Sequence, residues 1–244
     1  MKFNVGDTAY FPRVRLGLAQ NDLSSFYRGT VVDVGHSKIK LDLPGGVASD
    51  WVATSFAKSF IRTAVITFGD FDSEFYVFNP LAKNITHHLR LMLGPDEVVA
   101  VQVRSINELK KFWLKEQASI SHVVFIGHGN GTSVFFAIDE WVSGNDLSQA
   151  LRVHGAPKKH FLSLCCKSGL AAFAKSFSSA AICEDLVAPY HSVHAAVASQ
   201  FFSTYFLSQY LGGATSKIAF NKAEAAVVEG TKFRFWDNGH LKQS

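Results

Sequence analysis

Cysteine is scarce in this sequence, and the segments that direct a chain out of the cell are missing. Only three cysteines occur among 244 residues, and Cys165 and Cys166 are adjacent, so the sequence supports no disulfide framework. The N-terminal residues MKFNVGDTAY contain no apolar core of a signal peptide. We therefore expect a cytoplasmic protein with reduced cysteines.

Runs of basic residues and long apolar runs are also absent. The formal net charge is +4, but the lysines and arginines are scattered along the chain, which argues against a nucleic-acid partner. The most apolar segment, 193–211, is interrupted by His194, Gln200 and Gln209 before it reaches the length of a membrane span. This segment predicts a helix buried in a protein core, and we expect no membrane association.

The residues that are present can build a substantial core, because 48% of them are hydrophobic. In residues 1–58, short apolar stretches alternate with Gly, Pro, Asn and Asp turn signals and show no helical period. The stretches GDTAYFPR and YRGTVVDVGHSKIKLDLPGG resemble the small β-barrels of the Tudor and KOW kind. Residues 1–58 thus predict a small N-terminal β-barrel, which we expect to recruit a substrate or a regulator, or to restrain the second domain until a signal arrives.

Residues 59–244 have a different pattern, in which strands alternate with helices. This predicts an α/β domain with a mostly parallel sheet. Strands are expected at 63–70, 97–105, 122–129, 160–166 and 179–186. Helices are expected at about 80–93, 105–113, 145–153, 168–177, 193–211 and 219–228, and a hairpin at 132–141.

Two neighbouring strand ends carry the residues of thiol chemistry. His128 closes the third strand and Cys166 closes the fourth, and the carboxyl ends of parallel strands converge on one crevice. An imidazole and the positive end of a helix both activate a thiol, and Cys166 stands just before the helix expected at Ser168. The amide of Gly129 is placed to stabilise an oxyanion. The sequence thus predicts Cys166 as a nucleophile and His128 as its base.

The order of His-Gly at one strand end and Cys at the next resembles the caspase-like (clan CD) cysteine peptidases. Within this clan the sequence is similar to the CHAT branch, in which a strand ends in a small residue, Cys, any residue, Ser or Thr, and Gly. Here the motif reads Cys165-Cys166-Lys167-Ser168-Gly169, and the resemblance covers about residues 61–230. It implies a caspase-like three-layer sandwich and a cysteine endopeptidase that cleaves protein or peptide substrates, with roles in regulated cell death or defence.

The specificity of such a peptidase is expected to come from acidic residues near the site. Metacaspases carry an Asp two residues before the nucleophile, where this sequence has Leu164, so their calcium-dependent arrangement is not implied. Residues after the first strand contribute to the pocket in this clan, and Asp70 and Asp72 stand there, with Glu184 and Asp185 after the fifth strand. A carboxylate beside Cys166 would favour Arg or Lys before the scissile bond.

Other interpretations of these residues stay open. Cys165 and Cys183 are expected to be core residues. No metal site is predicted, because adjacent cysteines point to opposite faces of a strand and no Cys-x-x-Cys or His-x-x-x-His pair exists, and no organic cofactor is expected. The alternative to a peptidase is a catalytically inactive caspase-like interaction scaffold. A flavodoxin-like redox protein would need a phosphate-binding loop after the first strand, which the sequence lacks.

Overall fold

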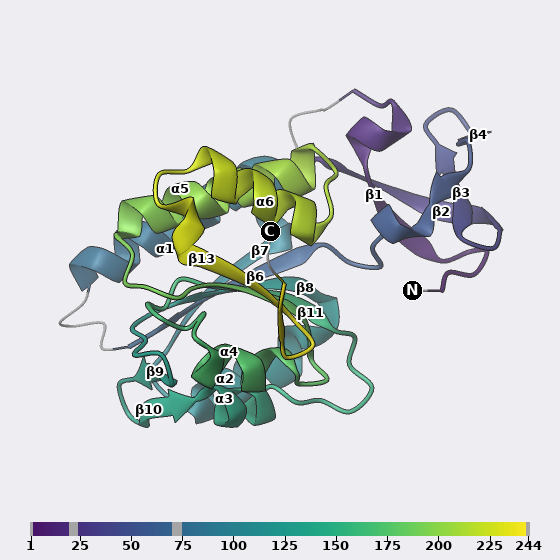
Figure 1. Ribbon diagram of the computed structural model, residues 1–244. Coiled ribbons are helices and arrows are strands. Elements are labelled where there is room, and N and C mark those ends of the chain that lie inside the picture. Colours follow the sequence, from purple (N-terminus) through teal and green to yellow (C-terminus); the bar gives the residue numbers. More distant parts are fainter. Residues whose placement is uncertain (1, 20–23, 70–74, 243–244) are drawn as a thin grey trace.

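The larger part of the molecule is a three-layer sandwich around a seven-stranded sheet (Figure 1). The computed structural model describes residues 2–19, 24–69 and 75–242. The strands lie in the order β14 (His240–Lys242), β13 (Phe233–Asp237), β12 (Cys183–Pro189), β11 (Lys159–Ser163), β8 (Ile120–Ile126), β6 (Arg62–Phe68) and β7 (Val98–Val103). The strands from β12 to β7 are parallel, and β13 and β14 are antiparallel at one edge. The prediction of a mostly parallel sheet is confirmed.

Helices cover both faces of this central sheet (Figure 1). One face is covered by α1 (Phe75–Leu93), α5 (Ala195–Phe206) and α6 (Ser216–Ala226), and the other by α2 (Ile106–Glu116), α3 (Gly144–Ala150) and α4 (Ala171–Ser178). A hairpin of β9 (Ser133–Phe136) and β10 (Glu140–Ser143) follows β8, and a π-helical turn, η5 (Leu207–Leu211), continues α5. Because helices lie on both sides, all seven residues of β8 are buried, and its sequence has an apolar run where a half-exposed strand would alternate.

The apolar segment at 193–211 forms α5 and η5, which are packed in the core as the sequence predicts. In the described parts of the chain, no helix is both long and apolar enough to cross a membrane. Single turns of 3₁₀ helix join several elements: η1 (Arg13–Leu16), η2 (Thr54–Phe56), η3 (Pro95–Glu97), η4 (Gln117–Ser119) and η6 (Gly230–Lys232).

Some element boundaries differ from those the sequence predicts. The Asn79-Pro80 pair predicts a helix start, but α1 begins at Phe75 and contains Pro80, because the earlier turn buries Phe78 against the sheet. The apolar character of Leu164, Cys165 and Cys166 predicts a strand through 166, but β11 ends at Ser163. The helix expected at Ser168 begins at Ala171, so four residues separate Cys166 from α4.

Residues 8–53 contain a second sheet, which we call the N-terminal sheet. Its strands are β1 (Thr8–Pro12), β2 (Phe26–Val34), β3 (Lys38–Leu43), β4 (Val47–Ala48) and β5 (Val52–Ala53). All pairings are antiparallel in the order β1-β2-β3-β4, with β5 also paired to β3, and a single bridge joins Tyr10 to Lys58. The strand path is open, so the closed barrel expected from the sequence is not observed. A small core of its own, including Phe11, Val31 and Leu41, supports this sheet.

The N-terminal sheet lies at the amino end of the parallel strands (Figure 1). A short segment, 54–61, connects its last strand, β5, to Arg62, the first residue of β6. The ring of Phe26 packs edge-on against Tyr210 of η5 at 5.6 Å between centroids. The Ser25 hydroxyl donates to the Met92 carbonyl at the end of α1 (2.9 Å), and the Arg15 guanidinium donates to the carbonyl that follows η5, at Gly213 (2.7 Å). The division into domains at residues 58 and 59 stays a prediction, since these contacts join the two parts.

Candidate functional site

The candidate site begins where β8 and β11 end side by side. The two strands are parallel neighbours, and the pairing continues past β11 because the Leu164 N–H donates to the Phe125 carbonyl (2.7 Å). Beyond these ends, a Cβ atom placed on Gly129 would lie 2.4 Å from the carbonyl oxygen of Cys166 and 3.1 Å from Cβ of Cys165. The backbone around Gly129 therefore lies in direct contact with the cysteine pair. The structure brings the His128-Gly129 and Cys165-Cys166 segments together.

The position of Gly129 requires a residue without a side chain. Contacts below 3.0 Å to a backbone oxygen cannot be relieved by moving a flexible side chain, so any Cβ at this position would separate the two segments. Gly127, one residue before His128, has a more relaxed contact with the ring of Phe68 at 3.3 Å. Within the Gly-His-Gly sequence, Gly129 thus lets the backbone approach the Cys166 carbonyl, and His128 is the residue before it.

The amide of Gly129 points away from the neighbouring hairpin. The Asn130 N–H donates to the Ser133 carbonyl (3.2 Å), and the Phe135 N–H donates to the His128 carbonyl (3.1 Å). Gly129 lies between these two bonds, which makes it a non-hydrogen-bonded position of the antiparallel pair. Its N–H therefore remains available on the side opposite β9, as an oxyanion donor requires.

The two adjacent cysteines occupy different environments. Cys165 is fully buried, and burial raises the pKa of its thiol to about 12. Cys183 at the start of β12 is also buried, and desolvation raises its pKa well above the ordinary value. Cys166 is partly exposed. Of the two adjacent cysteines, only Cys166 has surface open to solvent.

The turn after Cys166 is held by a buried serine. The hydroxyl of Ser168 contacts the Ser163 hydroxyl (2.7 Å) and donates to the Cys165 carbonyl (2.6 Å). This closure places Lys167 in the left-handed region at φ 62°, which is strained for a residue with a side chain. The strain is offset by fixed hydrogen bonds on both sides of Lys167, so the turn holds Cys166 in one orientation.

The end of β12 supports the same turn from the other side. The Gly169 N–H donates to the Pro189 carbonyl (2.7 Å), and a Cβ on Gly169 would lie 2.4 Å from the Ala188 carbonyl oxygen. The Lys167 N–H donates to the carbonyl of His191 (3.2 Å). Ser168 therefore bonds to the end of β11, and Gly169 fits against the end of β12, where a side chain would clash. This Ser-Gly pair does not begin a helix, which corrects the expectation that a helix N-terminus adjoins Cys166.

His128 lies at the surface beside this turn. Its side chain is exposed, and its ring packs edge-on against Phe78 of α1 with centroids 4.9 Å apart. The contact of Phe78 with His128 could not be predicted from the sequence, because a phenylalanine in an apolar helix face is ordinary core material. In this structure it forms one wall beside the imidazole.

Glu184 and Asp185, two of the four acidic residues expected at the site, do not lie beside Cys166. The sequence predicts a fifth strand over 179–186, with Glu184 and Asp185 at its carboxyl end, but β12 runs from Cys183 to Pro189, so both residues lie in its first half. Asp185 is paired in register with His160 at the start of β11, at the amino end of the sheet and opposite Cys166. Asp70 and Asp72 lie outside the described residues. Among the described residues, no group of three His, Cys, Asp or Glu side chains could hold a metal ion.

We expect Cys166 to be the first cysteine alkylated when iodoacetamide is added to the native protein. At pH 8, a pKa of about 12 leaves only about one Cys165 thiol in ten thousand ionised, and the thiolate is the reacting form. Cys165 and Cys183 should react only after unfolding in denaturant, which serves as the control. Peptide mass spectrometry of timed samples measures the three rates, and equal rates for Cys165 and Cys166 would contradict this assignment.

Comparison with known proteins supports the fold. No protein-family model and no curated protein matches this chain. Among solved structures, it is similar to a secreted C11 cysteine protease from Bacteroides thetaiotaomicron in complex with an irreversible peptide inhibitor, with a TM-score of 0.53 and 8% sequence identity. The match covers 73% of this chain and 66% of that chain, so this chain spans just under two thirds of the length of its neighbour. At this identity the likeness shows the fold alone, and the CHAT branch expected from the sequence is not shown.

Proposed function

We propose that this protein is a cysteine endopeptidase in which Cys166 is the nucleophile and His128 is the general base and acid. The observation that carries the proposal is the contact of Gly129 with the carbonyl of Cys166, which brings a histidine segment and an accessible cysteine to the same edge of the sheet. The fold shared with a C11 cysteine protease supports the same chemistry.

The proposed reaction has two stages that balance in atoms and charge. His128 takes the proton of the Cys166 thiol, and the thiolate attacks the scissile carbonyl to form a tetrahedral oxyanion, to which the Gly129 N–H donates. The C–N bond breaks as the imidazolium gives its proton to the leaving amine, and an acyl-thioester remains on Cys166. His128 then takes a proton from water, the resulting hydroxide attacks the thioester, and the free acid and the thiol are regenerated.

Substitution of the two adjacent cysteines separates the proposed nucleophile from its neighbour. Cys166→Ala should lower kcat/KM for a peptide substrate by a factor of about a thousand or more, and His128→Ala by about a hundred to ten thousand. Cys165→Ala is the matched control, because it removes a buried thiol from the adjacent residue and should leave most of the activity. A dead Cys165→Ala with an active Cys166→Ala would reverse the assignment. Full activity in both variants would show that neither thiol is the nucleophile, and no activity in the wild-type protein would favour the inactive scaffold as the role of this fold.

We further propose that the enzyme cleaves after Arg or Lys. Asp70 and Asp72 follow β6 in the sequence, and the stretch TFGDFDSEF contains no Arg that would select an acidic residue instead. An enclosed carboxylate favours a basic partner, since an unpaired buried charge is costly. We do not assign Glu184 and Asp185 to the specificity pocket, because both lie in the first half of β12, at the end of the sheet opposite Cys166.

A fluorogenic peptide library tests this specificity. We expect Arg and Lys before the scissile bond to be preferred, and the double variant Asp70→Asn/Asp72→Asn to lower that preference by about tenfold or more. The Glu184→Gln variant, altered at the amino end of β12, is the control and should keep the wild-type profile. Preference for acidic or large apolar residues in the wild-type enzyme would refute the idea.

We propose that residues 1–58 recruit a protein substrate or a regulator. The contacts of the N-terminal sheet with Met92, Tyr210 and Gly213 lie at the amino end of the strands, so this sheet leaves the edge that carries Cys166 open. Its largest exposed apolar side chain is Trp51, which is 42% exposed and lies beside the Lys40 ammonium, 4.9 Å from the ring centroid.

The role of Trp51 can be tested without removing the sheet. The inactive Cys166→Ala protein should retain a partner from a cell extract, and Trp51→Ala in that background should reduce the amount retained by about tenfold, as expected for an aromatic anchor. Val47→Ala, which alters another exposed apolar residue of the same sheet, is the control. Equal retention by the Trp51→Ala protein would assign the surface no part in recruitment.

A further inference from the structure

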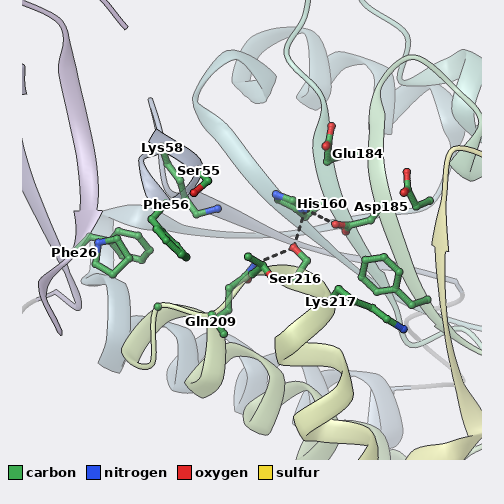
Figure 2. A pocket seen from close by; sticks show the side chains of 16 residues that line it. Phe26, Ser55, Phe56, Lys58, His160, Glu184, Asp185, Gln209, Ser216 and Lys217 are labelled. Carbon is green, nitrogen blue, oxygen red and sulfur yellow. Dashed lines mark hydrogen bonds and ion pairs between the residues drawn. The ribbon is translucent and has the colours of Figure 1, made fainter. Parts of the chain in front are cut away.

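The polar groups between the N-terminal sheet and the three-layer sandwich interact with one another. Figure 2 shows them around a polar cavity of about 310 Å³ at the amino end of the central sheet. His160 Nδ1 contacts both Asp185 (2.8 Å) and the Ser216 hydroxyl (3.1 Å), and Gln209 donates to the same hydroxyl (3.0 Å). The Asp185 carboxylate also attracts the Lys58 ammonium. The polar cavity is therefore held together by interactions within the chain.

The edge of the central sheet at β7 is open, in contrast to this cavity. Among the described residues only β6 pairs with β7, and no other backbone hydrogen bond reaches residues 98–103. The bond from the Ile138 N–H to the Arg104 carbonyl (2.9 Å) closes the edge only beyond the end of the strand. In an edge strand, every second residue directs its N–H and C=O away from the sheet. The outward groups of β7 can therefore pair with another strand.

Nothing in the sequence of β7 protects this edge. The strand reads VVAVQV, with four valines and neither a charged residue nor a proline. Edge strands are usually protected by being short, by lysines or by proline. The opposite edge has such protection, because β14 is three residues long and ends in Lys242, whose carbonyl accepts from the Lys217 ammonium (3.1 Å). Strand β7 is instead six residues long, which is enough to receive an extended segment.

A groove of about 490 Å³ lies between β7 and α1, and we call it the basic groove. It is lined by Ala100 and Gln102 of β7 and by Lys83, His87 and Arg90 of α1. The three α1 residues are exposed, and their i, i+4, i+7 spacing places them on one face of the helix. Neither Lys83 nor Arg90 forms an ion pair with a described residue, and no described acidic side chain lines the groove. The basic groove therefore attracts negative charge.

The two faces of the sheet differ at this edge. Val99 and Val101 are half-buried against the core on the α2 side. Because side chains alternate along a strand, Ala100 and Gln102 lie on the α1 side, in the basic groove. A strand added to β7 would continue both faces, with one set of side chains beside the basic groove and the other beside the valines. The first set is suited to be acidic and the second to be apolar.

We propose that β7 binds an extended segment of a partner protein in which acidic and apolar residues alternate. Acidic residues two apart in a strand repeat every 7 Å or so, and Lys83 and Arg90 are about 10 Å apart along α1, so two or three carboxylates meet the basic groove. A second copy of this chain fits less well, because antiparallel pairing about a two-fold axis would place both basic grooves on one face. The site is separate from Cys166, and binding at it does not require the protein to be a peptidase.

Fluorescence anisotropy with labelled nine-residue peptides tests the proposal on the wild-type protein. A peptide of alternating Glu and Val should bind in a saturable way, and peptides with the same residues in two blocks, or with Lys in place of Glu, should bind at least about tenfold more weakly. N-methylation separates strand pairing from charge attraction, because only every second N–H of the peptide faces β7. Methylation of one alternate set should abolish binding, and methylation of the other should not. Equal binding of the alternating and block peptides, or of the two methylated peptides, would overturn the proposal.

Charge reversal in the basic groove locates the bound peptide. Lys83→Glu/Arg90→Glu should weaken binding of the alternating peptide by about tenfold or more, since repulsion replaces attraction at two positions. Lys175→Glu/Lys222→Glu, at exposed positions of α4 and α6, is the matched control and should bind as the wild type does. Wild-type affinity in the first variant would place the binding elsewhere. Tighter binding of an oligothymidylate would assign the basic groove to nucleic acid, and a dimer of the free protein that excludes the peptide would assign β7 to a second copy. Each of these three results would refute the proposal.

Discussion

The close contact between Gly129 and the carbonyl of Cys166 is the constraint on which the candidate site depends. A side chain at residue 129 would lie 2.4 Å from that oxygen, so the two strand ends can meet only because the residue is glycine. The contact is continuous with the parallel pairing of β8 and β11, through the hydrogen bond from Leu164 to Phe125. The distance between histidine and cysteine segments is therefore set by a rigid sheet and not by flexible loops.

The difference between the two cysteines follows from the same turn. A strand that continued through 166 would place alternate residues on opposite faces, which by itself does not say which thiol meets the histidine. Because β11 ends at Ser163 and Ser168 bonds back to Ser163 and to the Cys165 carbonyl, Cys165 is enclosed and Cys166 is left at the edge. The buried Ser168 hydroxyl thus helps to determine which of the two cysteines is enclosed.

Sequence reasoning located the strands and the contact of the two strand ends, because these depend on local apolar runs and on a general property of parallel sheets. It misjudged where β11 ends, since Cys165 and Cys166 are as apolar as strand residues and the hydrogen bonds of Ser168 leave no periodic signal. It also placed Glu184 and Asp185 at the carboxyl end of the fifth strand, because the apolar residues just before them were taken as the body of that strand. Asp185 is tolerated in a strand because His160, 25 residues earlier, supplies its partner, and such a pairing cannot be read from local pattern.

The amino and carboxyl ends of the sheet are joined by the same two strands. His160 and Asp185 stand near the starts of β11 and β12, next to the polar cavity. The carboxyl ends of those strands hold Cys166 and its supports, since the turn after β11 bonds to Pro189 and His191 at the end of β12. Packed strands move as units, because close-packed interiors transmit displacement with little deformation. The amino and carboxyl ends of the sheet are therefore linked here by the pairing of β11 with β12.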